Sequence, residues 1–113
     1  MSSSCLFCRI VRGEIPSKKV YEDDEVLVFH DIDPAAPVHL LMIPKEHVEN
    51  LLSAESRHAA LLGKMLLLAP RLAREQGATD GFRIVINNGP DGGQEVYHLH
   101  VHVLGGPRPW KRL

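Results

Sequence analysis

The chain has 113 residues, with 13 basic and 14 acidic side chains and a net charge of −1 when its histidines are neutral. That length predicts a single domain. The near-neutral charge argues against a nucleic-acid polymer or a membrane surface as partner, since both attract basic patches. The sequence has neither an apolar run near the roughly 20 residues of a membrane span nor a signal-peptide pattern. A cytoplasmic protein is expected.

The first elements are a short helix and a β-hairpin. Residues 5–13, CLFCRIVRG, predict a helix that Gly13 ends. Residues 20–32, VYEDDEVLVFHDI, predict a hairpin with Asp23 and Asp24 at its tip, because two β-prone runs flank this pair and apolar residues recur along the second run.

A third strand and a long helix follow. Residues 37–44, PVHLLMIP, read as a strand because proline brackets the apolar run at both ends and cannot donate to a β-ladder. Residues 53–76 follow the helical period, with Ser53 as the expected N-cap and Gly77 just past the end. Pro70 lies inside this helix and is expected to kink or divide it.

Two further strands complete the expected fold. They are residues 82–87, FRIVIN, and residues 98–104, HLHVHVL, and a glycine-rich loop separates them. Consecutive strands with the helices set apart predict an α+β domain built on an antiparallel sheet.

Three histidines share the fifth expected strand: His98, His100 and His102 stand at strict two-residue spacing. Successive side chains of a strand point to opposite faces, so the imidazoles would line one face while the intervening residues enter the core. One interpretation is a solvated face, although neutral imidazoles there share no structural reason to repeat. A second is a metal platform. A third is nucleophilic catalysis, in which one imidazole attacks and its neighbours hold its tautomer or give protons.

The loop before this strand helps to separate these interpretations. It carries Gly89, Gly92 and Gly93, and glycine permits the tight turns by which backbone N–H groups converge on an anion. Alone it would be read as a plain turn. Directly before three histidines, it favours a phosphate held within reach of a nitrogen nucleophile.

Cys5 and Cys8 are too close together for an ordinary loop-closing disulfide. A thioredoxin-type redox site needs a strand before its CxxC, and only four residues precede Cys5. A structural zinc site and a pair of free buried thiols remain, and the spacing alone does not decide between them.

The chain as a whole resembles the histidine triad (HIT) superfamily, in particular its Hint branch. The resemblance rests on CxxC followed by RIVRGEIP, on YEDDEVLVFHDIDPAAPVHLLMIPKEH, and on NNGPDGGQEVYHLHVHVLGG, in this order and spacing. It implies one HIT domain over residues 1–113, with a C-terminal tail from residue 105. It also implies a HIT-like fold with a five-stranded antiparallel sheet, one long and one short helix, and a two-fold homodimer. Residues 61–68 are apolar around more of the helix than one small core requires, which fits a dimer.

The resemblance implies that the protein cleaves purine nucleoside 5′-phosphoramidates or aminoacyl-adenylates to the nucleoside monophosphate. His100 would be the nucleophile that forms a nucleotidyl-histidine intermediate, and His102 would contact the phosphate or the leaving group. His39 would hydrogen-bond within the cluster, and Asp31 would accept from the ribose hydroxyls. The implied nucleotide-binding set is Phe7, Ile10, Phe29, His30, Asp31, Ile32, Asn87, Gly93, Gln94, Glu95, His100 and His102. The alternative is a nucleotide-binding regulatory module in which hydrolysis is vestigial.

The resemblance also implies a structural zinc ion held by Cys5, Cys8, His47 and His98. One position departs from the eukaryotic pattern: Glu95 stands where those relatives carry a serine thought to donate to the leaving nitrogen. His58, on the long helix, is most simply a surface residue.

Overall fold

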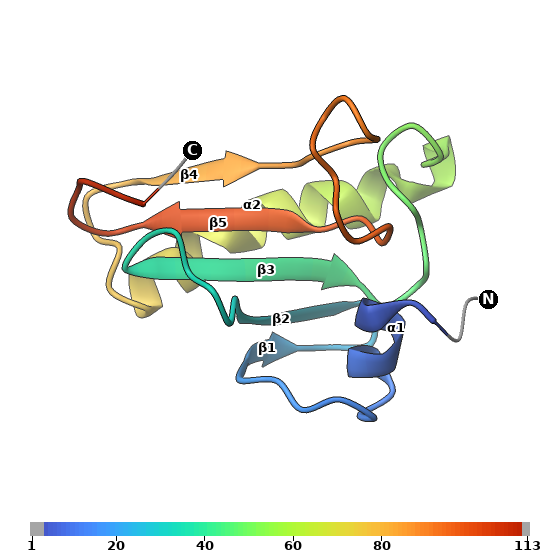
Figure 1. Cartoon of the computed structure of the whole chain (residues 1–113), viewed down its shortest axis with the longest axis horizontal. Coiled ribbons are helices and arrows are strands. Elements are labelled where there is room, and N and C mark those ends of the chain that lie inside the picture. Colours follow the sequence, from blue (N-terminus) through green and yellow to red (C-terminus); the bar gives the residue numbers. More distant parts are fainter. Residues whose placement is uncertain (1–3, 112–113) are drawn as a thin grey trace.

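The computed structural model describes residues 4–111, so the last two residues of the expected tail lie outside the described part. Five antiparallel strands form one sheet in the order β1-β2-β3-β5-β4 (Figure 1). The strands are β1 (Lys19–Glu22), β2 (Val26–His30), β3 (Val38–Pro44), β4 (Phe82–Val85) and β5 (Val101–Gly105). The helices are α1 (Leu6–Val11), the short 3-10 turn η1 (Ser56–His58) and α2 (Ala59–Glu75). The expected α+β architecture is confirmed. Among these helices there is none with the length and apolar character to traverse a bilayer.

The main core lies between α2 and one face of the sheet, as Figure 1 shows with α2 behind the strands. Met65, Ala69, Leu72 and Ala73 of α2 are buried there. The strands contribute the alternate residues whose side chains point to this face, since side chains change face at each step along a strand. These are Val26, Val28, Val38, Leu40, Met42, Val101 and Val103.

Helix α1 and the histidines His39 and His102 lie on the opposite face of the sheet. Phe7 and Ile10 of α1 pack on Leu27, Phe29, Leu41 and Ile43 in a second buried cluster. In the β3–β5 ladder, Leu41 stands opposite His102 and His39 stands opposite Leu104. Directly paired residues point to the same face, so His39 and His102 lie beside the α1 cluster.

The long helix differs in part from its prediction. It begins at Ala59 after η1, not at Ser53, whose hydroxyl instead donates to the carbonyl of Asn50 at 3.1 Å. The predicted N-cap was therefore wrong, because Ser53 closes a turn within the preceding loop. Pro70 was expected to kink or divide the helix, and α2 continues through it without a division. Gly77 follows the helix with a φ of 110°, as expected of a residue that ends a helix.

The fifth strand is shorter than predicted, because the ladder begins at Val101 opposite Met42. Farther along β3 stands Pro44, which has no N–H to donate. The N–H of Leu99 instead donates to the carbonyl of Val48 at 2.6 Å. His98 and His100 therefore lie in an extended segment before β5, and of the three triad histidines only His102 lies within the strand.

His58 was expected at the surface, and that prediction was wrong. Its exposed fraction is 4%. Its Nδ1 accepts from the N–H of Glu55 at 2.9 Å, and its Nε2 lies 3.2 Å from a carboxylate oxygen of Glu46. These bonds turn the ring inward, which the helical period alone could not predict.

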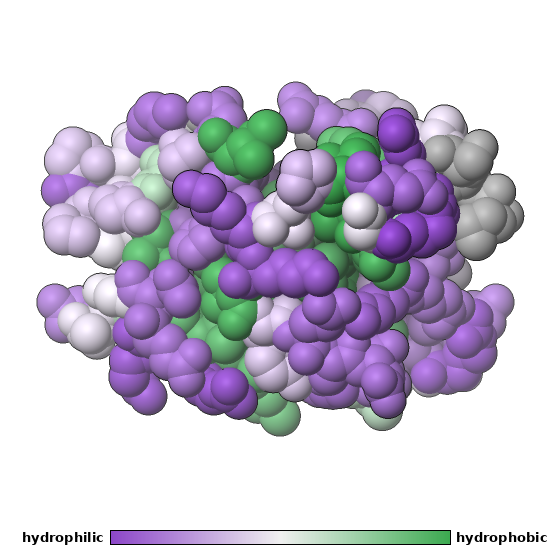
Figure 2. Space-filling view, turned by 90° about the horizontal axis from the view of Figure 1, so that it is seen from below, coloured by the Kyte–Doolittle hydropathy of each residue, from purple (hydrophilic) through white to green (hydrophobic). Residues whose placement is uncertain are grey.

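Asp23 ties the tip of the β1–β2 hairpin to α2. Its carboxylate accepts from the hydroxyl of Tyr21 at 2.7 Å, from Nζ of Lys64 at 2.8 Å and from the N–H of Val26 at 2.8 Å. Burial alone would raise the pKa of Asp23, but the bonds from Lys64 and Tyr21 outweigh burial and hold that pKa well below its usual value. Figure 2 views the molecule from the β1 side, where hydrophilic residues predominate on the surface.

We expect Asp23→Asn to lower the melting temperature at neutral pH, and the difference from the native protein to shrink as the pH falls below about 4. Because the folded pKa is depressed, the stabilisation is complete above the unfolded pKa and is lost progressively as the pH falls from the unfolded pKa to the folded pKa. Thermal melts followed by circular dichroism between about pH 7 and pH 2.5 measure this difference. The exposed neighbour Asp24 provides the control variant, Asp24→Asn. A difference that stayed constant over the range would contradict the prediction.

Candidate active site

His100 is held with one ring nitrogen facing the backbone. Its exposed fraction is 7%, and its Nδ1 lies 2.7 Å from the carbonyl oxygen of His98. A carbonyl can only accept, so Nδ1 carries the proton of the neutral ring and Nε2 keeps its lone pair. Burial lowers the pKa of His100, against the opposing effect of that carbonyl and of the nearby carboxylates of Asp31 and Glu95. A neutral imidazole with a free Nε2 has the form that a nitrogen nucleophile requires.

His39 and His102 form a hydrogen-bonded pair in which the donor and the acceptor can be assigned. The N–H of Ala35 donates to Nδ1 of His39 at 3.0 Å, so the proton of a neutral His39 resides on Nε2. That Nε2 lies 2.9 Å from Nδ1 of His102 and 3.4 Å from a carboxylate oxygen of Asp31. When His39 donates to His102, the proton of neutral His102 resides on its Nε2. His102 then offers an N–H donor, and its ring centre lies 5.0 Å from that of His100.

Aromatic rings pack against His100 from the α1 side. Phe7 meets His100 edge to face at 5.0 Å and meets Phe29 in the same manner at 5.7 Å, measured between ring centres. Phe7, Phe29 and Ile10 are buried core residues, so their side chains form a rigid floor. Ile32 is 99% exposed at the rim, and the neighbouring His30 and Asp31 are half-buried.

The glycine loop closes mainly on itself. The N–H groups of Gly92 and Gln94 donate to the carbonyl of Gly89 at 3.2 and 3.1 Å, and that of Gly93 donates to the carbonyl of Pro90 at 3.1 Å. A Cβ at Gly92 would lie 2.4 Å from the carbonyl oxygen of Asn88, so only glycine fits there. These three N–H groups are thus used inside the loop and do not converge on an anion.

The remaining predicted loop residues are distributed around this turn. Asn87 is half-buried, while Gly93 and Glu95 are exposed. The charge of Glu95 opposes the lowering of the pKa of His100. Gln94 is buried, and its side-chain amide bonds to neighbouring protein groups.

The structure brings Cys5, Cys8, His47 and His98 together as predicted. Their ligand atoms all lie within 4.8 Å of one another. Sγ of Cys5 is 3.4 Å from Nδ1 of His98, and Sγ of Cys8 is 3.2 Å from Nδ1 of His47. Nε2 of His98 lies 2.7 Å from the carbonyl oxygen of Pro44, which fixes the proton on Nε2 and points the lone pair of Nδ1 toward the sulfurs. Two sulfur and two imidazole donors in this arrangement suit tetrahedral zinc.

The two kinds of ligand differ in protonation. Burial and the neighbouring Cys5 together raise the pKa of the Cys8 thiol to about 11, so a metal would have to displace its proton. Burial lowers the pKa of His98 to about 4, against the bond to Pro44, so this ring is neutral and able to bind a metal at ordinary pH.

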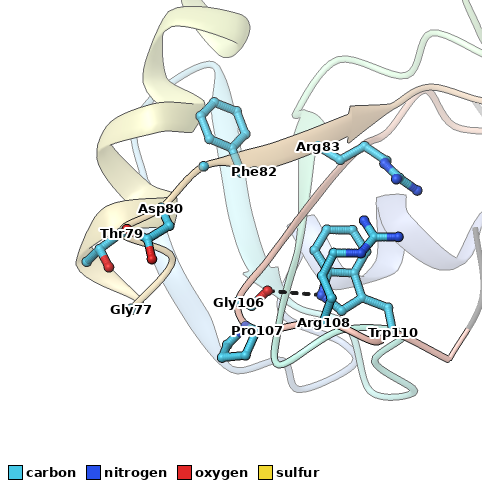
Figure 3. A pocket seen from close by; sticks show the side chains of 10 residues that line it. Gly77, Thr79, Asp80, Phe82, Arg83, Gly106, Pro107, Arg108 and Trp110 are labelled. Carbon is cyan, nitrogen blue, oxygen red and sulfur yellow. Dashed lines mark hydrogen bonds between the residues drawn. The ribbon is translucent and has the colours of Figure 1, made fainter.

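Two surface cavities lie apart from His100. The larger, about 660 Å³, lies between the turn before β4 and the C-terminal tail (Figure 3). There the guanidinium groups of Arg83 and Arg108 stack on the ring of Trp110 at 5.2 and 4.6 Å, and Nε1 of Trp110 donates to the carbonyl of Gly106 at 3.1 Å. The smaller, about 340 Å³, borders the Cys/His cluster and is lined in part by Glu49, Glu95 and Tyr97.

Comparison with known proteins shows which family the chain belongs to. The profile of the HIT domain matches residues 12–108, which include His39 and the three histidines of the triad. The chain belongs to the HIT family.

Relatives within the HIT family match nearly the whole chain. Protein HitA of Neisseria gonorrhoeae is 54% identical over 92% of this chain and 97% of its own length. The 14 kDa zinc-binding protein of Zea mays is 51% identical over 92% of this chain and 83% of its own. Adenylylsulfatase HINT1 of Arabidopsis thaliana is 51% identical over 92% of this chain and 72% of its own. The crystal structure of a HIT family hydrolase from Legionella pneumophila superposes with a TM-score of 0.89, at 46% identity, over 93% of this chain and 95% of that one.

Several residues that shape this HIT site escaped the sequence analysis. The carbonyls of His98 and Pro44 and the N–H of Ala35 fix the tautomers, and backbone groups of this kind carry no sequence signal. Asn50 is a buried polar residue that bonds to Gln94 at 2.9 Å. It lies within a loop, where asparagine is common, so the sequence alone gives no reason to select it.

Proposed function

We propose that this HIT protein is a hydrolase that cleaves purine nucleoside 5′-phosphoramidates or aminoacyl-adenylates and releases the nucleoside monophosphate. The single observation that carries the proposal is the fixed tautomer of His100, whose Nδ1 donates to a backbone carbonyl and leaves Nε2 free to attack phosphorus. The names of two relatives, a HIT family hydrolase and an adenylylsulfatase, support hydrolysis of a nucleotide conjugate.

The reaction proceeds in two displacements. Nε2 of His100 forms a bond to phosphorus, and the P–N bond to the leaving amine breaks while the amine takes a proton from water and the Nε2–H of His102 donates to a phosphoryl oxygen. A second water then attacks the same phosphorus, the bond to His100 breaks, and the attacking water gives up its proton to solvent. The ring of His100 is a good leaving group in the second step because imidazole accepts the displaced electron pair readily.

The other predicted residues bind and orient the nucleotide. Asp31 accepts from the ribose hydroxyls, and Phe7 and Phe29 provide the apolar floor under the base. The exposed Ile32 is the side chain that the base would cover. Glu95 faces the leaving group near His100, in the place of the serine of eukaryotic relatives.

The Cys/His cluster holds zinc in this proposal, with Cys5, Cys8, His47 and His98 as ligands. When bound there, the metal supplies a structural cross-link between α1 and the segment that carries His100. The zinc-binding protein of Zea mays supports this choice of metal by its name. The ligand His98 itself supplies the carbonyl that accepts from His100, so the site fixes the nucleophile through two residues of chain.

The protein functions as a two-fold homodimer. β4 is an edge strand whose outer N–H and C=O groups could pair with a second copy, and α2 exposes Leu66 by 43% and Leu67 by 80%. Sedimentation at micromolar concentration should give twice the chain mass, and Leu67→Glu should shift the protein toward monomer. Leu52→Glu is the matched control, since Leu52 is 81% exposed in a loop outside α2 and β4. A native protein that sediments as a monomer would contradict the proposed dimer.

Incubation with adenosine phosphoramidate tests the hydrolase directly. Release of AMP that disappears in His100→Ala supports the enzyme. Tight binding of AMP without turnover would favour the alternative, a nucleotide-binding regulatory module. A comparison across adenosine and guanosine substrates and across amine leaving groups then defines the specificity.

A further inference from the structure

The side-chain amide of Gln94 is fully engaged with the protein. Its exposed fraction is 6%. Oε1 accepts from Nδ2 of Asn50 and from the N–H of Gly89, both at 2.9 Å. Nε2 donates to the carbonyl of Glu49 at 2.7 Å and to that of Val96 at 3.0 Å. A carboxamide has two N–H donors and two acceptor sites, so all four are used and none is left for a phosphate.

Asn50 is the side-chain partner of Gln94. It is also 6% exposed, and its Oδ1 accepts from the N–H of Leu52 at 2.9 Å. A second bond joins the same two segments, because the N–H of Leu51 donates to Oδ1 of Asn88 at 2.8 Å. Segment 49–52 and loop 88–94 are thereby fastened to each other, and Figure 1 shows the green and orange segments side by side.

Both segments adjoin residues of the candidate site along the chain. Segment 49–52 follows His47, and the carbonyl of Val48 accepts from the N–H of Leu99, between His98 and His100. On the other side, the Gln94 amide bonds to the carbonyl of Val96, two residues before His98. The paired amides therefore set the path of the chain as it enters the segment that carries the nucleophile.

We propose that Asn50 and Gln94 are positioning residues: their paired buried amides hold loop 88–94 and the segment before His100 in the reactive arrangement. This inference rests on the hydrolase proposed above and changes the role expected of Gln94 from nucleotide contact to internal support. A small displacement of a nucleophile is costly, because attack requires close alignment with phosphorus.

The kinetic test uses Gln94→Ala, Asn50→Ala and the double variant, with adenosine phosphoramidate as substrate. Each single variant should lower kcat by about 100-fold with KM nearly unchanged, since base and ribose are bound elsewhere. The double variant should be no slower than either single one, because the two side chains act as a unit. Asp91→Ala, an exposed change in the same loop, is the control and should keep native kcat.

Direct contact between Gln94 and phosphate predicts a different pattern. Gln94→Ala would then raise KM, and Asn50→Ala would leave kcat near the native value. That result would overturn the proposal.

Amide hydrogen exchange tests the same pairing without any turnover. The N–H of Gly89 should be protected in the native protein and should exchange markedly faster in Gln94→Ala, which lacks its acceptor. Rapid exchange of Gly89 in the native protein, or equal protection in both proteins, would contradict the pairing. Native protection in a protein that fails to cleave the phosphoramidate would instead reject the proposed function and leave the pairing intact.

Discussion

Replacement of His100 by alanine is expected to abolish turnover, with a loss in kcat of about 10⁴-fold or more. The variant removes the only atom that the proposal places in bonding contact with phosphorus. AMP affinity should change little, because the base and ribose contacts come from Phe7, Phe29 and Asp31. Steady-state release of AMP measures the first quantity, and calorimetric titration with AMP measures the second.

A matched control is available for the loss of a histidine. His58 is as buried as His100 but lies in η1 at the start of α2 and is not one of the triad histidines. His58→Asn can still accept from the N–H of Glu55 and should keep native kcat. Substantial turnover by His100→Ala, or a loss of AMP binding equal to its loss of activity, would contradict the assigned role.

Removal of the metal is expected to have the largest effect on stability. A strong chelator should lower the melting temperature of the purified protein by about 10 °C or more, because binding energy at a structural site adds to folding free energy. Cys8→Ser should melt at the temperature of the chelated native protein and should not respond to chelator. Thermal melts combined with zinc analysis by mass spectrometry measure both effects.

The pH dependence of zinc binding has a defined sign. Burial raises the pKa of Cys8 to about 11, and metal binding must displace that proton, so affinity should fall as the pH is lowered. Competition with a chromogenic chelator at several pH values measures this affinity. A native protein that contains no zinc and melts equally with and without chelator would show that Cys5 and Cys8 are free buried thiols.

The elements that local signals define were predictable from sequence. The Asp23–Asp24 pair between two β-prone runs predicted the hairpin, and β1 and β2 lie on either side of it. β3 ends at Pro44 as predicted, because a proline removes the donor that the next ladder bond needs.

The errors came from contacts between distant segments. Ser53 looked like a helix cap, but its hydroxyl is taken by the carbonyl of Asn50. The fifth strand was expected to include His98 and His100, but Leu99 bonds to Val48 across about 50 residues of chain instead of extending the ladder. No periodicity within a single segment contains that information.

The candidate site was also predictable only in part from local sequence signals. Alternation of histidines predicted that His100 and His102 would be neighbours, and their ring centres lie 5.0 Å apart. The direction of each hydrogen bond depends on backbone groups such as the N–H of Ala35, which any residue at that position would supply. The family resemblance named the residues, and the three-dimensional arrangement was needed to assign their tautomers and to reveal the support from Asn50.

Trapping the covalent intermediate shows directly whether His100 is the nucleophile. A reaction with adenosine phosphoramidate is quenched under conditions that preserve phosphohistidine, and the digested protein is analysed by mass spectrometry. We predict one adenylyl group on the peptide that contains His100, with fragmentation placing it on that residue and with none found in His100→Ala. An adduct on His98, His102 or another residue would show that His100 is not the nucleophile. Turnover by the native protein with no adduct, under conditions that trap one in a known HIT hydrolase, would show the same.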